Sequence, residues 1–155
     1  MDELIKKFYT AFDQLDAETM ASCYHDDIVF EDPAFGVLKG PQAGNMWRML
    51  ANSQKGKEFK ITFSNIKTDD NNGSAQWEAF YNFSKTGRKV HNVISASFEF
   101  KDGKIIKHTD YFDLHKWAKQ AMGFKGLLLG GTGFFKRKLN QQTNHLLSKF
   151  ENNKL

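Results

Sequence analysis

The sequence has almost no cysteine and no long apolar run. Its 155 residues include one cysteine, Cys23, which excludes an internal disulfide and leaves a zinc site without spaced partners. No apolar stretch approaches the roughly 20 residues that a membrane-spanning helix needs. The chain starts with Met1-Asp2-Glu3-Leu4, which is acidic and unlike the apolar segment of a secretory signal. We therefore expect a cytoplasmic protein without a membrane span.

Motifs for metals, nucleotides and nucleic acids are missing as well. The five histidines show no metal-ligand spacing, and no Ser-His-Asp signature stands out. The glycine-rich stretch 126–133 lacks the Lys-Ser/Thr ending of a phosphate-binding loop. The net charge of +4 comes mostly from scattered lysines, with one cluster at Lys136-Arg137-Lys138. We expect no metal, no cofactor and no nucleic-acid partner.

Aromatic residues are plentiful, and the hydrophobic periodicity changes along the chain. Apolar residues recur at helical spacing within 4–12 and predict a first helix. Asp16 is placed to cap a second, short helix, and Gly40-Pro41 opens a third. Between the last two helices, residues 28–32 form a strand that Pro33 ends. The period becomes two from Phe59 onwards, with turns at 69–73, 86–87 and 101–104. This pattern predicts an antiparallel meander that ends near Phe112.

Helices followed by a meander indicate an α+β fold. We expect a cone-shaped domain over residues 1–122, with the N-terminal helices packed on a curved mixed or antiparallel sheet. A helix over 113–122 and a last helix around 139–150 flank a segment rich in glycine and leucine. Residues 123–155 would form a C-terminal helical extension that packs on the domain or on a dimer partner.

Two of the expected strands place carboxylates among apolar residues. Because side chains of a strand alternate between its faces, Ile28, Phe30 and Asp32 share one side. Likewise, Ile106, His108, Asp110 and Phe112 share one side of the last strand. A carboxylate in an apolar interior needs a partner or it raises its pKa, and such a group suits proton transfer.

These strands carry a resemblance to a known superfamily. The stretch from His25 to Pro33, the hairpin at Gly87 and the run from Asp102 to Leu114 resemble the nuclear-transport-factor-2-like superfamily over roughly residues 1–122. Within it the chain is similar to SnoaL-like polyketide cyclases, ketosteroid isomerases and limonene epoxide hydrolase. The resemblance implies a cone with a hydrophobic pocket, often in a homodimer formed through the sheet. Members include enzymes and binding modules, so the fold does not decide the chemistry.

The resemblance assigns roles residue by residue. Asp32 matches the general base of the isomerases, but their oxyanion-hole tyrosine falls on Phe8, beside Tyr9, and their protonated acid falls near Ala96. Asp110 matches one acid of the Asp-Arg-Asp set of the epoxide hydrolase, whose other two members should lie near 77–79, where neither Arg nor Asp occurs. In SnoaL-like cyclases an acid placed like Asp110 serves as acid/base.

The catalytic candidates are thus Asp110, Asp32 and His108, and each has a structural alternative. His108 could be a hydrogen-bonded core histidine or one exposed at the rim. Asp32 could accept backbone N–H bonds in the turn at Pro33. Asp110 could form an ion pair or a hydrogen bond with a neighbour such as His108, His91 or Arg48. We expect His108 and Asp110 to lie about 7 Å apart along the strand, too far for direct contact unless the side chains lean together. Asp113 is expected to cap the next helix.

Aromatic residues are the candidates for lining a pocket, although such stripes are more often core. Those we assign to the pocket are Phe8, Phe12, Tyr24, Phe30, Trp47, Trp77, Tyr81, Phe98 and Phe112. Tyr9, Tyr24 and Tyr111 are possible hydroxyl donors. His91 and Glu78 fall on the opposite face of their strands.

The sequence leaves two functions open. The first is a cofactor-independent isomerase, cyclase or dehydratase that uses Asp110 as general acid/base on a hydrophobic carbonyl compound. The second is a non-catalytic binding module for a small hydrophobic ligand, with a homodimer through the sheet expected in both cases. Leu127-Leu128-Leu129 could wrap the domain as a lid or dimer arm, or press on a membrane surface with help from Lys136-Arg137-Lys138. We favour the wrap, because the last helix is itself amphipathic.

Overall fold

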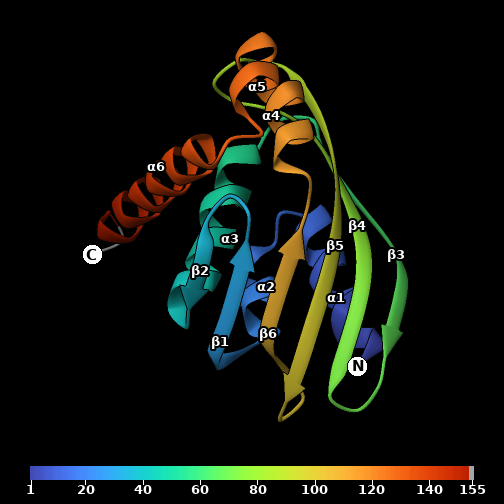
Figure 1. The fold of residues 1–155 in the computed structure, drawn as a ribbon. Coiled ribbons are helices and arrows are strands. Elements are labelled where there is room, and N and C mark those ends of the chain that lie inside the picture. The colour runs from blue at the N-terminus through green and yellow to red at the C-terminus, as the bar shows by residue number, and fades with distance from the viewer. Residues whose placement is uncertain (154–155) are drawn as a thin grey trace.

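Helices and strands follow the order that the periodicity predicts. The computed structural model describes residues 1–153. The elements are α1 (Asp2–Asp13), α2 (Ala17–Ser22), β1 (Tyr24–Asp32), β2 (Gly36–Lys39), α3 (Pro41–Gln54), β3 (Phe59–Thr68), β4 (Asn72–Asn82), β5 (Lys89–Lys101), β6 (Lys104–Tyr111), α4 (Leu114–Met122), α5 (Phe124–Leu129) and α6 (Gly133–Asn152) (Figure 1). The sequence analysis missed β2, which has four residues, and did not assign α5 to a helix.

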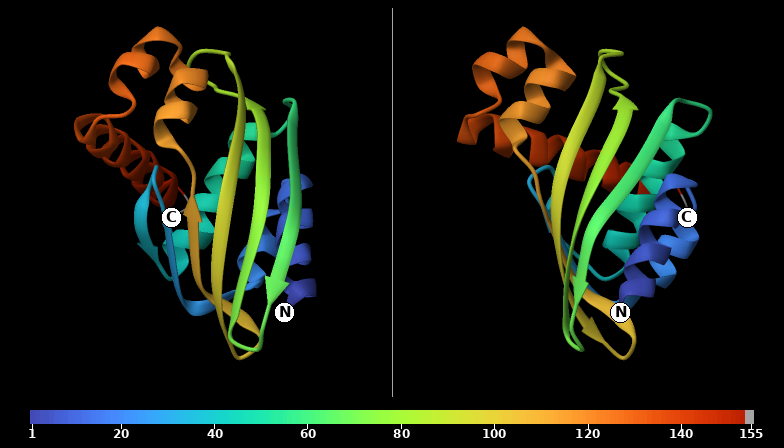
Figure 2. Two further views of the ribbon diagram at one scale, coloured as in Figure 1. Left: turned by 45° about the vertical axis from the view of Figure 1, so that its right-hand side comes forward. Right: turned by 90° about the vertical axis from the view of Figure 1, so that its right-hand side faces the viewer.

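The strands form one mixed sheet in the order β2-β1-β6-β5-β4-β3. Strands β3 to β6 make the expected antiparallel meander, and β1 joins β6 in parallel. Helices α1, α2 and α3 cover one face of the twisted sheet, while the other face of the long strands carries no helix over most of its length (Figure 2). The α+β fold, with helices on one face of a curved mixed sheet and a C-terminal helix, is therefore confirmed.

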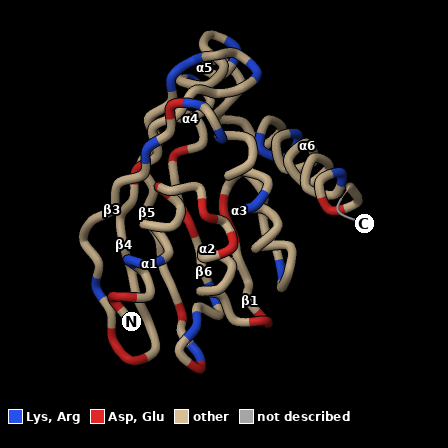
Figure 3. Tube along the Cα trace, turned by 180° about the vertical axis from the view of Figure 1, so that it is seen from behind, with Lys and Arg blue, Asp and Glu red and all other residues tan. Residues whose placement is uncertain are grey.

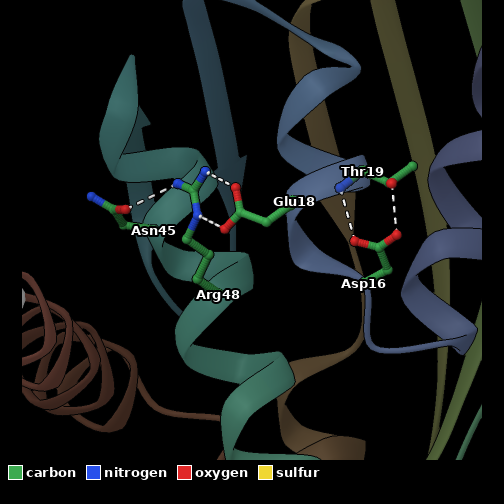
Figure 4. Close-up of polar contacts among 5 residues, drawn as sticks. All are labelled: Asp16, Glu18, Thr19, Asn45 and Arg48. Carbon is green, nitrogen blue, oxygen red and sulfur yellow. Dashed lines mark hydrogen bonds and ion pairs between the residues drawn. The ribbon is translucent and has the colours of Figure 1, made fainter.

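A side-chain cap begins α2, and an ion pair joins α2 to α3. Asp16 accepts hydrogen bonds from the backbone N–H and the hydroxyl of Thr19, at 3.0 and 2.6 Å, which confirms it as the cap of α2. The guanidinium of Arg48 on α3 donates to both carboxylate oxygens of Glu18 on α2, at 2.6 and 2.8 Å (Figure 4). Arg48 also donates to Asn45, so its side chain is held in one orientation. These contacts hold α3 against α2, and α3 packs on β1 and β2.

A β-bulge changes which side chains of β6 face the core. Phe100 pairs with Ile105 while Glu99 pairs with Lys107, so Ile106 is an extra residue on β6. As a result Ile105 is fully buried and Ile106 only half-buried. The prediction that Ile106 shares the buried face of His108 was wrong, because strict alternation fails at the bulge. Beyond the bulge, His108 and Asp110 point inward as predicted.

Beyond β6 the chain forms α4, α5 and α6, with a turn at 130–132 between the last two, and α4 begins at a capped end. Residues 154–155 of the expected extension lie outside the described residues. Asp113 accepts a hydrogen bond from Lys116 N at 3.0 Å, which confirms its capping of α4, and Gly123 ends that helix. Helix α6 packs on α3. Within residues 1–153, no helix combines the length and the apolar character that crossing a bilayer requires.

Polar side chains of α6 bind the turn between β1 and β2. Asn140 donates to the carbonyl oxygens of Pro33 and Ala34, both at 2.9 Å, and Asn144 donates to that of Phe35 at 2.8 Å. This turn directly follows Asp32. The last helix therefore supports one wall of the region where the candidate residues lie.

Candidate functional site

His108 and Asp110 form a buried pair on the inner face of β6. Nε2 of His108 lies 2.9 Å from Oδ1 of Asp110, with the histidine fully buried and the aspartate 4% exposed. The two side chains lean together along the strand, which is the condition that the expected spacing of about 7 Å set for direct contact. The ion pair or hydrogen bond that we named as the structural alternative for Asp110 is present. It is also the contact that an acid/base pair needs.

A chain of hydrogen bonds sets the tautomer of His108. Nε1 of Trp47 donates to the hydroxyl of Tyr24 at 2.8 Å, and an indole N–H can only donate. The Tyr24 hydroxyl, 2.8 Å from Nδ1 of His108, is then free to donate its own proton to that nitrogen. His108 consequently carries its proton on Nε2 and donates it to Asp110. The chain runs from α3 through β1 to β6 and holds the imidazole in place.

Asp110 has one engaged oxygen and one open oxygen. Nε1 of Trp77 on β4 also donates to Oδ1, at 3.2 Å. Within residues 1–153, Oδ2 makes no hydrogen bond. The side-chain atoms that are both unpaired and fully enclosed there belong to Tyr9 and Gln54, and Oδ2 of Asp110 is not one of them. Oδ2 is therefore the oxygen that retains the small exposure of this side chain. Residues 77–79 are the segment in which the resemblance places an arginine partner of Asp110. Trp77 of this segment does face Asp110, but it supplies an indole N–H in place of a guanidinium.

Asp32 lies beside Asp110 on the neighbouring strand. The register pairs Glu31 with Thr109, so the next residues, Asp32 and Asp110, are neighbours across the parallel β1–β6 pair. Oδ1 of Asp32 accepts from the backbone N–H groups of Ala34 and Phe35, at 2.9 and 2.6 Å. Burial raises the pKa of Asp32 to about 7; the charge of Asp110 adds to this, while the backbone bonds oppose it. Asp32 thus both binds the backbone of the turn and lies next to Asp110.

Tyr9, one of the three tyrosines named as possible hydroxyl donors, points into the interior. Its hydroxyl on α1 is buried and has no hydrogen-bond partner among the described residues. Burial raises its pKa well above the usual range, and the nearby charge of Asp110 raises it further, so the hydroxyl stays protonated at neutral pH. An unpaired buried donor is costly and therefore informative. The helical period put Tyr9 beside the matched position at Phe8, but only the coordinates reveal that it points inward without a partner.

Aromatic rings enclose the pair. Phe98, Phe30 and Phe8 lie 4.5, 5.2 and 5.4 Å from the imidazole of His108 between ring centroids. Most of the residues that we assigned to the pocket are buried in this cluster, namely Phe8, Phe12, Tyr24, Phe30, Trp47, Trp77, Phe98 and Phe112. A hydrophobic pocket over Asp110 remains a prediction, because the rings pack closely there.

Two hollows among the described residues lie elsewhere. One of about 570 Å³ opens at the ends of β3, β4 and β5 and includes the partly buried Tyr81, whose hydroxyl accepts from Trp117. Another, of about 380 Å³, lies along α1 and the start of α2. Neither is lined by Asp32, His108 or Asp110.

The remaining candidates separate clearly. Tyr111 is 68% exposed and points away from the site. His91 and Glu78 lie on the outer face, 3.6 Å apart, as their phase predicts. Among residues 1–153, no group of three or more His, Cys, Asp or Glu side chains gathers as metal ligands do. The site consists of Asp110, His108, Tyr24, Asp32 and Tyr9.

Comparison with protein families gives a match that covers most of the chain. A family described as a SnoaL-like domain matches residues 5–108. This range includes α1 to α3, the strands up to β5 and most of β6. No curated protein matches the chain.

Solved structures share the fold at low sequence identity. An LEH-like epoxide hydrolase from M. tuberculosis is 24% identical with a TM-score of 0.59, over 83% of this chain and 89% of that one. A putative polyketide cyclase from Xanthomonas campestris pv. campestris is 18% identical with a TM-score of 0.61, over 76% and 93% of the two chains. Bal32a, from a soil-derived mobile gene cassette, is 21% identical with a TM-score of 0.64, over 76% and 93%. At these identities the likeness shows the fold alone.

Proposed function

The chain belongs to the SnoaL-like domain family, and from the geometry of its interior we propose that it is a cofactor-independent acid/base enzyme. Its substrate would be a small hydrophobic carbonyl compound, and the reaction an isomerisation, cyclisation or dehydration that begins with proton abstraction next to the carbonyl. The similarity to an epoxide hydrolase and a putative polyketide cyclase is compatible with such chemistry but does not select it.

One observation carries the proposal: two neighbouring carboxylates occupy different surroundings. Oδ1 of Asp110 is held by two N–H donors while its Oδ2 is open. Asp32 has a pKa of about 7, so a proton resides on it for part of the time at neutral pH. Carboxylates that differ in this way are suited to act as base and acid in one reaction.

The roles follow from these positions. Oδ2 of Asp110 takes the proton from the carbon next to the carbonyl, and the electron pair of the broken C–H bond moves towards the carbonyl oxygen. The unpaired hydroxyl of Tyr9 donates a hydrogen bond to that oxygen as charge develops on it. Protonated Asp32 returns a proton at another atom of the substrate, and His108 orients Asp110. Because Asp110 is 4% exposed, the aromatic side chains over it must move for a substrate to enter.

Proton exchange tests the proposal without knowledge of the natural substrate. Small cyclic ketones are incubated with the protein in D₂O, and NMR follows the loss of signal from the protons next to the carbonyl. We expect exchange above the buffer rate, and a fall of about a hundredfold or more for Asp110→Asn. Tyr9→Phe should lower the rate with the fold unchanged by circular dichroism.

A matched control is Asp26→Asn, because Asp26 is exposed on β1 and remote from the inner face. It should exchange ketone protons at the wild-type rate. Exchange that persists in folded Asp110→Asn, or no exchange with any ketone of the panel, would reject the proposal.

A second candidate function is a non-catalytic binding module for a small hydrophobic ligand. The observation that favours it is the close aromatic packing around a completed chain from Trp47 to Asp110. A hydrophobic fluorescent probe distinguishes the two functions. Binding of the probe that Trp77→Ala alters, together with absence of ketone exchange, would favour the module.

We also propose that two copies pair through the outer face of the sheet. Phe80, Val93 and Tyr111 are 36%, 45% and 68% exposed there, among polar and charged side chains of β4 and β5. Apolar side chains exposed on an uncovered sheet face favour burial by a partner. Sedimentation velocity should show a dimer that Val93→Glu converts to a monomer, whereas Val37→Glu on β2 should leave it intact.

A further inference from the structure

Helix α5 exposes its large apolar side chains and buries its glycines. Gly126 and Gly130 are buried, whereas Phe124, Leu127, Leu128 and Leu129 are 72%, 43%, 61% and 50% exposed. We call these four exposed residues the apolar tip. A helix at the surface of a protein ordinarily turns its leucines inward, so this arrangement is reversed. Figure 1 places α5 at one end of the molecule, opposite the hairpin between β5 and β6.

Close packing on α4 prevents α5 from turning its leucines inward. A Cβ atom at Gly126 would lie 1.9 Å from the carbonyl oxygen of Ala118, and one at Gly130 would lie 2.5 Å from the Ala118 side chain. Only glycine fits at these two positions. His115 adds a hydrogen bond from Nε2 to the carbonyl of Leu127 at 2.7 Å. The outward direction of the leucines is therefore built into the contact between the helices.

The chain segment that contains the apolar tip carries charge of one sign. Residues 114–150 contain seven lysines and arginines and no aspartate or glutamate, so the rest of the chain carries a net charge of −3. Lys125, Lys136, Arg137 and Lys138 are exposed, and none of them takes part in an ion pair within residues 1–153. Figure 3 shows Lys and Arg on α5 and the start of α6, with acidic residues reappearing only at the far end of α6.

We propose that α5 and the start of α6 form a docking site for an anionic lipid surface. The apolar tip would enter the boundary between headgroups and acyl chains, and the four unpaired cations would bind acidic headgroups. A nucleic acid would supply negative charge for the lysines and Arg137, but it would supply no hydrocarbon in which the leucines could be buried. A second copy of this chain offers the leucines, but a two-fold contact through the tip would bring the same cations face to face.

Vesicle co-sedimentation tests the docking site on the full chain. The vesicles are pure phosphatidylcholine, or phosphatidylcholine with roughly 30% phosphatidylserine to give a negative surface. We expect binding to the anionic vesicles that weakens with added salt, and at least about tenfold weaker binding to the neutral ones. Phe124→Gln with Leu128→Gln, and separately Lys136→Gln with Lys138→Gln, should each lower the anionic partition coefficient about tenfold.

Matched double variants control for hydrophobicity and for net charge. Val37→Gln with Leu146→Gln removes two exposed apolar side chains away from α5, and Lys7→Gln with Lys101→Gln removes two exposed lysines. Both should bind anionic vesicles within about twofold of the wild type. Circular dichroism and thermal melting verify that all four variants fold.

Three results would overturn the docking site. The first is absence of binding to anionic vesicles. The second is equal loss of binding in the tip variants and their controls. The third is a change of sedimentation in the tip variants without vesicles, which would show that the apolar tip joins two copies of the chain.

Discussion

Asp32 and Asp110 are the same kind of side chain in two different surroundings. Asp110 receives N–H donors from His108 and Trp77, while Asp32 receives backbone N–H donors yet still has a pKa of about 7. The difference arises because burial and the neighbouring carboxylate disfavour a second negative charge next to Asp110. One strand pair thus holds two carboxylates in the different surroundings that the proposed acid/base roles require.

The raised pKa of Asp32 predicts a pH-dependent stability. The folded pKa of about 7 exceeds the value of 3.8 expected in the unfolded chain, so the folded state holds this proton more tightly. The stabilisation that the folded state gains from this tighter proton binding is fully present below about pH 4 and is lost as the pH rises to about 7. Between these two pH values, the unfolding free energy should fall less in Asp32→Asn than in the wild type, and the two falls should differ by as much as about 4 kcal/mol. Chemical denaturation at a series of pH values measures both. Parallel curves for the two proteins would contradict the raised pKa.

Removal of the Tyr24 hydroxyl should destabilise the protein. Tyr24→Phe leaves Nε1 of Trp47 and Nδ1 of His108 without partners in a closed interior. We expect the unfolding free energy to fall by about 3 kcal/mol, because each unpaired buried group carries a desolvation penalty. Tyr111→Phe is the control, since Tyr111 is exposed and makes no such bond. A loss no greater than that of the control would show that the chain of bonds is absent in solution.

At the scale of elements, caps and a bulge position the site. The bulge at Ile106 shifts the phase of β6 so that both Ile105 and His108 face the core. If Ile106 took part in strict alternation from Ile105, His108 and Asp110 would turn to the outer face. Single-residue irregularities of this kind are invisible to a period-two pattern.

The cap of α2 gives a prediction at this scale. Asp16→Ala removes the bond to Thr19 N and should lower the unfolding free energy by about 1 kcal/mol. Asp70→Ala, in the exposed turn between β3 and β4, should change it by much less. Urea denaturation of the two variants side by side measures the difference, and equal values would argue against a stabilising cap.

At the scale of the whole molecule, the last helix supports the turn that follows Asp32. Asn140→Ala with Asn144→Ala removes three hydrogen bonds from α6 to residues 33–35. We expect faster amide hydrogen exchange at Phe35, by about tenfold, and a lower pKa of Asp32 as water reaches the loosened turn. The control is Gln141→Ala with Gln142→Ala, whose side chains are exposed on the same helix. Unchanged exchange at Phe35 would mean that the turn holds its shape without α6.

The sequence by itself determined the order of the elements and all of them except β2 and α5. Helical and period-two patterns, Gly40-Pro41, Asp16 and Asp113 located the helices and the meander, because these signals depend only on neighbours along the chain. The inward direction of His108 and Asp110 was also predictable from the alternation of β6. The resemblance to SnoaL-like proteins led to the same fold and to Asp32 and Asp110.

Only the tertiary structure decided which groups touch. The contact between His108 and Asp110 on β6, the indole of Trp77 on the same oxygen and the unpaired hydroxyl of Tyr9 involve three separate elements. The reversal of α5 likewise depends on Gly126 meeting Ala118 of another helix. Periodicity assigns a side chain to a face of its own element, whereas the distance to a side chain on another element depends on how the elements pack.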